Sequence, residues 1–140
     1  MRQIILLGFI FCGINNVKAQ TNANTPILNG TWIPTTQEMG GKQLPSAAFE
    51  KQKLILDDSV YTVIAESVDK GIARYQNGKI DIYGKEGVNA GRHFTAIYKY
   101  ENDLLTICYN LKGDKYPEAF DTKENPLYFM SVFKKEELPK

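Results

Sequence analysis

Residues 71–83, GIARYQNGKIDIY, decide the fold class of this 140-residue chain. Two short β-prone segments, residues 71–75 and 79–83, flank the tripeptide Gln76-Asn77-Gly78. Asn and Gly tolerate the positive φ that both central residues of a type I′ turn require, and this turn matches the twist of paired antiparallel strands. The stretch therefore predicts a β-hairpin.

Similar hairpins are predicted on both sides of this one. Asp58-Ser59 separates two apolar segments upstream, and Glu101-Asn102-Asp103 separates two more downstream. Asp, Asn and Ser favour such turns because their side chains hydrogen-bond to the nearby backbone. The glycine-rich residues 84–91, GKEGVNAG, and the polar residues 110–126 are predicted to be loops. The predicted strands are, in chain order, residues 28–38, 53–57, 60–65, 71–75, 79–83, 93–100, 104–109 and 127–134.

About eight short strands with mostly short connections predict an all-β domain, either a sandwich or a barrel. The up-and-down order favours the barrel, because a sandwich needs long Greek-key crossovers and the only long connections lie near the two ends of the chain. Closure also hides the strand edges. Pro45 precedes the helix-forming stretch SAAFEKQ, which predicts one short helix after the first strand. The predicted fold is thus an eight-stranded up-and-down antiparallel barrel with one short helix.

Alternation along the strands assigns side chains to the inside of this barrel. In residues 60–65 it leaves two sets open, one beginning with Val60 and the other with Tyr61. The interior residues elsewhere include large side chains, so we expect a filled or nearly filled barrel with a small cavity. The predicted interior residues are Leu54, Leu56, Ile80, Ile82, Leu105, Ile107, Tyr109, Phe129 and Phe133.

The N-terminal segment is predicted to be a secretory signal peptide over residues 1–19. Arg2 supplies its positive charge, residues 4–14 its apolar run and Val17-Lys18-Ala19 its small-residue cleavage site. The apolar run is too short to span a bilayer, so we expect an exported product, periplasmic or extracellular, without a membrane anchor. Three further parts are predicted: a flexible leader (20–27), one domain (28–135) and a charged tail (136–140).

The charge balance argues against a nucleic-acid partner. Removing residues 1–19 takes away two basic residues and no acidic one, so the formal net charge changes from +1 to −1. Binding to nucleic acid or to an anionic membrane surface requires a basic patch, and a chain with a net charge near zero is not expected to have one.

Neither a catalytic nor a metal-binding constellation is predicted. Cleavage removes Cys12, which leaves Cys108 as the one thiol, and a single thiol of this kind is more often buried and inert than reactive. A structural zinc site needs about four ligands, and the exported chain offers one His and one Cys. Counting from the hairpin turn places His93 and Cys108 out of register, so no nucleophilic pair is expected. We therefore expect no cofactor and no enzymatic activity.

The tripeptide Gly30-Thr31-Trp32 stands at the start of the first predicted strand and resembles the G-x-W motif of the lipocalin and calycin group. The resemblance implies that Trp32 closes one end of the barrel. It also implies that a basic residue after the last strand, Lys134 or Lys135, packs on the indole.

Residues 28–135 also resemble the small lipocalin-like domain of secreted bacterial proteins known as the planctomycete-type domain. The resemblance implies an eight-stranded barrel with a short helix after the first strand, and it implies no activity. The matching residues are Leu28, Gly30, Thr31, Trp32, Gly41, Lys42, Leu44, Pro45, Gly71, Ile80, Asp81, Ile82, Gly87, Gly91, Ile97, Tyr98, Leu105, Ile107, Cys108, Pro117, Phe120, Phe133 and Lys134.

Four residues are candidates for ligand binding. Tyr98 and Tyr109 combine an apolar ring with a hydroxyl group, although aromatic residues also favour strands for packing alone. Arg74 and Arg92 can hold a ligand carboxylate at the mouth of a barrel, although exposure to solvent is the commoner fate of Arg. Asp81 faces either a cavity or, more often for a residue in this position, the solvent.

Two functions remain open at this stage. The first is an exported, monomeric, non-catalytic domain that binds a small apolar or amphipathic molecule inside the barrel. The second is a protein-interaction or inhibitor module that contacts a protein partner through the loops at residues 84–91 and 110–126.

Overall fold

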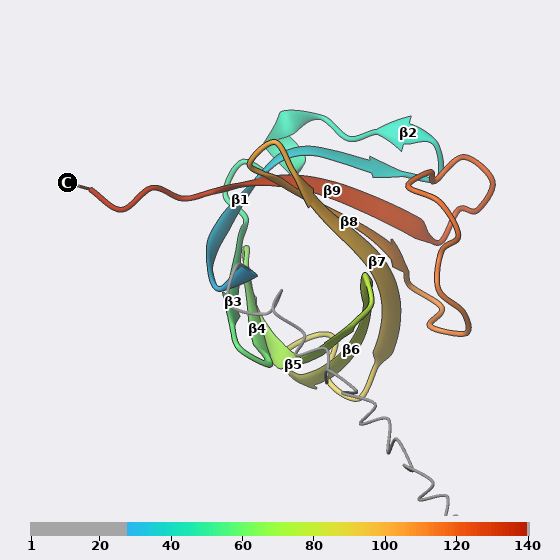
Figure 1. Ribbon diagram of the computed structural model, residues 1–140, viewed down its shortest axis with the longest axis horizontal. Coiled ribbons are helices and arrows are strands. Elements are labelled where there is room, and N and C mark those ends of the chain that lie inside the picture. The colour runs from blue at the N-terminus through green and yellow to red at the C-terminus, as the bar shows by residue number, and fades with distance from the viewer. Residues whose placement is uncertain (1–27, 140) are drawn as a thin grey trace, which may run out of the picture.

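One antiparallel sheet rolls up into a closed barrel in the computed structural model, which describes residues 28–139 (Figure 1). The predicted signal peptide, the leader and the last residue of the tail lie outside the described residues. The strands are β1 (Gly30–Met39), β2 (Lys42–Gln43), β3 (Lys53–Asp57), β4 (Val60–Ile64), β5 (Val68–Gln76), β6 (Lys79–Glu86), β7 (His93–Glu101), β8 (Leu104–Asn110) and β9 (Tyr128–Lys135).

The strands follow one another around the ring in chain order, and β1 pairs with β9 to close it. The two-residue strand β2 lies outside this ring and pairs only with the end of β1 (Figure 1). The other eight strands form the barrel. The predicted closed, up-and-down, antiparallel barrel is therefore confirmed.

The predicted short helix is replaced by a single 3-10 turn, Ser46–Ala48. Pro45 before this turn is extended and makes no side-chain capping hydrogen bond, and no residue within the turn is buried. Phe49 alone anchors the segment in the protein. Isolated helical segments of this length are marginal without packing along one face, so the segment does not continue as an α-helix.

The two ends of the barrel differ because short and long connections alternate along the chain. Residues 58–59, 77–78 and 102–103 form tight two-residue turns at one end. Asn77 and Gly78 have φ of 49° and 77°, as a type I′ turn requires, so the predicted central hairpin is confirmed. The longer connections 40–52, 65–67, 87–92 and 111–127 all lie at the other end. We call these the narrow end and the wide end.

Trp32 fills the narrow end of the barrel. Its side chain is fully buried, its Nε1 donates a 2.8 Å hydrogen bond to the Leu28 carbonyl, and the Tyr100 ring meets it edge-on at 5.8 Å. The Lys135 ammonium lies 5.7 Å from the centre of the indole ring. Gly30 leaves room for this lysine, because a Cβ there would lie 2.5 Å from Lys135 Cε. Of the two lysines that the resemblance left open, Lys135 is the one over the indole.

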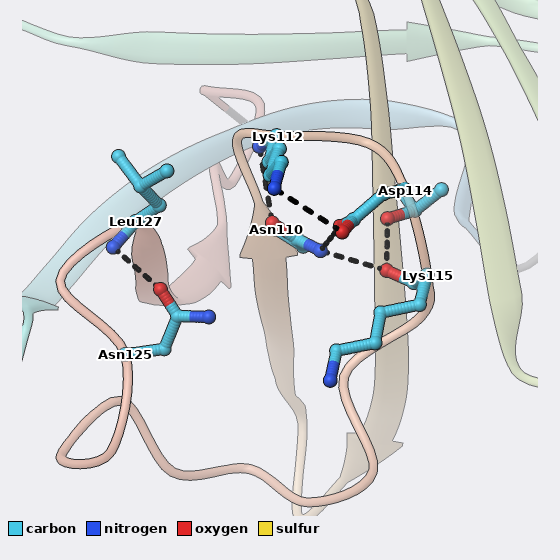
Figure 2. Close-up of polar contacts among 7 residues, drawn as sticks. Asn110, Lys112, Asp114, Lys115, Asn125 and Leu127 are labelled. Carbon is cyan, nitrogen blue, oxygen red and sulfur yellow. Dashed lines mark hydrogen bonds and ion pairs between the residues drawn. The ribbon is translucent and has the colours of Figure 1, made fainter.

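The connection between β8 and β9, residues 111–127, packs against the outside of the barrel, and we call it the strap. Asn110 Nδ2 donates to the Lys115 carbonyl at 2.9 Å and to Asp114 Oδ1 at 2.8 Å, and Thr95 Oγ1 also donates to the Lys115 carbonyl, at 2.6 Å (Figure 2). Further along the strap, the Phe120 ring lies 4.6 Å from the Lys99 ammonium. These contacts hold the strap across β7 and β8.

Cys108 lies on β8 and is fully buried, with the backbone of Asp121 in the strap near its thiol. Burial raises the pKa of the Cys108 thiol to about 11, against the smaller opposing effect of the Asp121 backbone. The thiol is therefore protonated at neutral pH, and the predicted burial of Cys108 is confirmed.

No helix within residues 28–139 has the length and apolar character that crossing a membrane requires.

Replacing Trp32 with Ala is expected to lower the free energy of unfolding by about 3–5 kcal/mol, because it opens a large void and removes a buried hydrogen bond. Urea denaturation followed by far-UV circular dichroism measures the loss, since Trp32 is the one tryptophan available for fluorescence. Trp32→Phe, which retains a ring, is the control and is expected to lose about half as much. A loss below about 1 kcal/mol for Trp32→Ala would contradict the role of the indole.

Candidate functional site

The barrel holds a cavity of about 790 Å³, lined from the wide end to Leu56, Tyr75 and Ile80 near the turns of the narrow end. The sequence predicted a small cavity, and this prediction is wrong. The large predicted interior residues Tyr109 and Phe129 line this space without filling it, and their rings stack on each other with centres 5.7 Å apart. Ala73, a small residue at an inward position, adds further room.

The wall of the cavity is mainly apolar and comes from every barrel strand. The two open alternatives for residues 60–65 are resolved, because Tyr61 and Val63 line the cavity whereas Val60 is 42% exposed. The predicted interior residues are inside. Aliphatic and phenylalanine side chains in the wall include Leu54, Leu56, Val63, Ala73, Ile80, Ile82, Phe94, Ile107, Phe129 and Phe133.

Three tyrosines add hydroxyl groups to this apolar wall, namely Tyr61, Tyr75 and Tyr109. Among residues 28–139, every fully buried side-chain nitrogen or oxygen has a hydrogen-bond partner. The three hydroxyls make no hydrogen bond to another described residue, so their oxygens border the cavity space. Burial, with a smaller effect from neighbouring groups, raises the pKa of all three, which keeps them protonated at neutral pH. Each can donate and accept a hydrogen bond.

Charged residues lie nearer the wide end. Asp69 on β5 is 8% exposed, and its Oδ1 accepts a 3.1 Å hydrogen bond from the backbone N–H of Asn89. Arg92 is exposed, with its guanidinium 5.6 Å from the centre of the Phe94 ring. Lys112, also exposed, lies 3.8 Å from an Asp114 carboxylate oxygen. The one buried charge of the wall is therefore the Asp69 carboxylate.

The four predicted ligand-binding residues lie in different places. Arg92 and Tyr109 both line the cavity. Tyr98 packs against the core below it, edge-on to Tyr75 at 5.7 Å. Arg74 is exposed, and its guanidinium lies 5.6 Å from the centre of the Tyr83 ring. The structure thus brings two of the four residues to the cavity.

The sequence analysis missed Asp69 because the predicted strand began at Gly71, whereas β5 begins at Val68. Extending the alternation backwards by two residues places Asp69 on the same face as Gly71, Ala73 and Tyr75. A period-two pattern that contains a charged residue and a glycine is hard to recognise, since both residues are depleted in strands.

A second polar cluster surrounds Asp81 on β6, which does not line the cavity, although its neighbour His93 does. His93 Nε2 lies 3.0 Å from Asp81 Oδ1, and the Tyr116 hydroxyl of the strap donates a 2.5 Å hydrogen bond to Asp81 Oδ2. The His93 ring stacks on Tyr83 with centres 4.6 Å apart. Of the two positions considered for Asp81, the structure shows the one outside the cavity. His93 is engaged with Asp81, while Cys108 pairs with Ile97 across β7 and β8.

The contacts in this cluster change the pKa of the Asp81 carboxyl group and the pKa of the Tyr116 hydroxyl group. Partial burial acts to raise the pKa of Asp81, but hydrogen bonds from Tyr116 and His93 and the nearby positive charge outweigh it, so this pKa is lowered. The same hydrogen bond, with burial, raises the pKa of Tyr116 to about 12. The ionised carboxylate therefore helps to hold the strap on β6.

No group of three or more His, Cys, Asp or Glu side chains in the described part of the chain is arranged to hold a metal ion. The arrangement in the cavity, an apolar wall with a few polar groups, is typical of a site that binds a small molecule. Comparison with protein-family models, curated proteins and solved structures gives no match for this chain.

Replacing Tyr116 with Phe is expected to lower the free energy of unfolding by about 1 kcal/mol at pH 7, because it removes a hydrogen bond to a partly exposed carboxylate. The pKa of Asp81 is lowered in the folded state, so the ionised group contributes stability above its ordinary value of 3.8 and loses this contribution as the pH falls through the lower folded value. The difference between the wild type and the variant should therefore shrink below about pH 3.8.

Urea denaturation at a series of pH values measures this effect. Tyr83→Phe is the control. It removes a hydroxyl group from the same outer region, and this hydroxyl makes no hydrogen bond to a described residue. The variant is therefore expected to change the free energy of unfolding by less than about 0.5 kcal/mol at every pH. A constant difference between wild type and Tyr116→Phe down to pH 2 would show that the Asp81 carboxylate is not its source.

Proposed function

We propose that this chain is an exported, non-catalytic, lipocalin-like domain that binds a small apolar or amphipathic molecule in its barrel. The observation that carries the proposal is the cavity of about 790 Å³, with a mainly apolar wall that includes three tyrosines whose hydroxyls make no hydrogen bond to another residue of the described range 28–139. Ligand sites commonly have volumes of about 300–1,000 Å³, with a few polar groups that orient the ligand.

The hydrophobic effect provides the driving force for binding. Removing the apolar surface of a ligand from water contributes roughly 25 cal/mol per Å². A wall made mainly of Leu, Ile and Phe side chains offers little to polar solutes except at the tyrosine hydroxyls and at a few polar or charged side chains such as Asp69. The site therefore favours a molecule with an apolar body and a small number of polar groups.

The narrow end of the barrel supports the lipocalin-like assignment. Trp32 and Lys135 have the relationship that the resemblance to the lipocalin and calycin group implies, with the cation over the indole at 5.7 Å. The predicted signal peptide supports export. Eight-stranded barrels of this kind either are filled by side chains or hold one small ligand, and here the interior is not filled.

The interaction-module alternative is supported by one feature, Val88 in the connection between β6 and β7. Its side chain is 73% exposed at the wide end, where it is available to a protein partner. A single exposed aliphatic residue is common on protein surfaces, however, and it leaves the unpartnered hydroxyls inside the barrel unexplained. We therefore favour the ligand-binding function.

Replacing Ala73 with Phe is expected to weaken binding of a neutral fluorescent probe, N-phenyl-1-naphthylamine, by at least tenfold. The new ring occupies cavity space, because Ala73 lies in the wall. The enhancement of probe fluorescence on titration with protein measures the affinity. Arg74→Ala is the matched control, since it changes the next residue of the same strand on its exposed side and is expected to alter affinity by less than twofold.

Saturable binding to the wild type together with its loss in Ala73→Phe would support the proposed function, provided that both variants unfold cooperatively. Equal affinity in Ala73→Phe and the wild type would place the probe outside the barrel.

Native mass spectrometry of protein from its own source should additionally show a retained small molecule, whereas a co-purifying protein would favour the interaction-module alternative.

A further inference from the structure

We propose that the molecule bound in the cavity is an amphipathic amine, and that the Asp69 carboxylate receives its ammonium group. This inference rests on the proposed function and assigns the chemical class of the ligand. It starts from the position of Asp69, the one buried charged side chain in the cavity wall.

The Asp69 carboxylate lacks the partners that a buried charge needs. It makes one hydrogen bond, from the Asn89 backbone N–H to Oδ1, and within residues 28–139 no basic side chain forms an ion pair with it. Burying an ionised carboxylate is costly unless it is paired and hydrogen-bonded. Because no fully buried side-chain oxygen in this region lacks a partner, Oδ2 borders the cavity space.

The connection between β6 and β7 holds this carboxylate in place from the wide end. Gly87, with a φ of 90°, packs so closely on Asp69 that a Cβ there would lie 2.4 Å from Oδ1. Asn89 then donates its backbone N–H to the same oxygen. One carboxylate oxygen is thus fixed by the protein, and the other is left for a ligand.

Tyr61 supplies a second acceptor near Asp69. Gly71, two residues from Asp69 on the same face of β5, leaves room for the tyrosine, since a Cβ there would lie 2.9 Å from the Tyr61 hydroxyl oxygen. After burial, the negative charge of Asp69 is the second cause that raises the pKa of Tyr61, which reflects their proximity. An ammonium group has three N–H donors, which match a carboxylate oxygen and a hydroxyl oxygen.

The aromatic residues of the wall also favour a cation. The ring faces of Phe and Tyr carry negative electrostatic potential, which attracts a desolvated ammonium group close to them. Tyr61, Tyr109, Phe94 and Phe129 all line the same cavity as Asp69. A ligand with an apolar chain and an ammonium head is complementary to both parts of this wall.

An anionic ligand fits the cavity less well. Its carboxylate would share a space of low dielectric constant with Asp69, where repulsion between like charges is strong. Arg92, Lys112 and Lys53 carry the opposite charge, but all three are exposed, so water screens them, and Lys53 also forms an ion pair with Glu136. The buried Asp69 therefore determines the preferred charge of the head group.

The test compares three probes with the same ten-carbon chain, decylamine, decan-1-ol and decanoate, by isothermal titration calorimetry at pH 7 below their micellar concentrations. Decylamine is expected to bind at least tenfold more tightly than decanoate. In Asp69→Asn, decylamine should lose at least tenfold in affinity, while the affinity for decan-1-ol should change by less than twofold. Tyr61→Phe should weaken decylamine binding about threefold and leave decan-1-ol binding unchanged.

Glu86→Gln is the matched control for charge, because it makes the same change at an exposed residue near the same end of the barrel. It is expected to leave decylamine affinity within twofold of the wild type, whereas a loss as large as that of Asp69→Asn would overturn the assignment of Asp69.

Equal affinity for all three probes, or tighter binding of decanoate, would refute the proposal of an amine ligand while preserving the proposed cavity function. Absence of binding by every probe would refute both. If Asp69→Asn does not unfold cooperatively, the Tyr61→Phe result decides.

Discussion

The pairing of β1 with β9 is the constraint on which the rest of this protein depends. It joins the first and last strands of the described chain and turns an open sheet into a barrel with an inside. The register shifts between Pro34 and Thr36, at a point where proline has no N–H to donate to the neighbouring strand. The bulge allows the pairing to continue from Trp32 at the narrow end to Met39 at the wide end.

The unequal lengths of the connections then make the two ends of the barrel different. Two-residue turns hold strands together at the narrow end, where Trp32 and Tyr100 complete the packing. The long connections keep the wide end from being filled in the same way. The free volume lies between the packed floor and the long connections, and the polar groups of the wall gain importance because they lie beside that volume.

The sequence predicted those features that depend on local chemistry. Asn77-Gly78 and Asn102-Asp103 produce turns through their own backbone preferences, so the hairpins and the strand order were recognised correctly. The burial of Leu54, Ile80 and Leu105 followed from alternation.

Features that depend on distant parts of the chain were not predictable in this way. Tyr109 stacks on Phe129, a residue of the neighbouring strand, in the wall of the cavity, and no spacing rule shows whether two large side chains fill the interior of a barrel or line a space within it. The inward position of Asp69 depends on the length of β5, and that length is set by pairing with Ile64 and Val63 on β4. The turn of 3-10 helix replaces the predicted helix for a related reason, since only tertiary packing stabilises so short a segment.

The separation of the stabilising groups of the floor from the groups proposed to bind a ligand has a consequence for how this protein tolerates change. Trp32, Lys135 and Tyr100 stabilise the floor and are not among the residues that line the cavity, whereas Asp69 and the tyrosine hydroxyls add polar groups to the wall at some cost to stability. A ligand that satisfies those groups binds the folded state alone and so stabilises it. Substitutions in the wall can therefore alter the preferred ligand while the floor and the β1–β9 pairing maintain the fold.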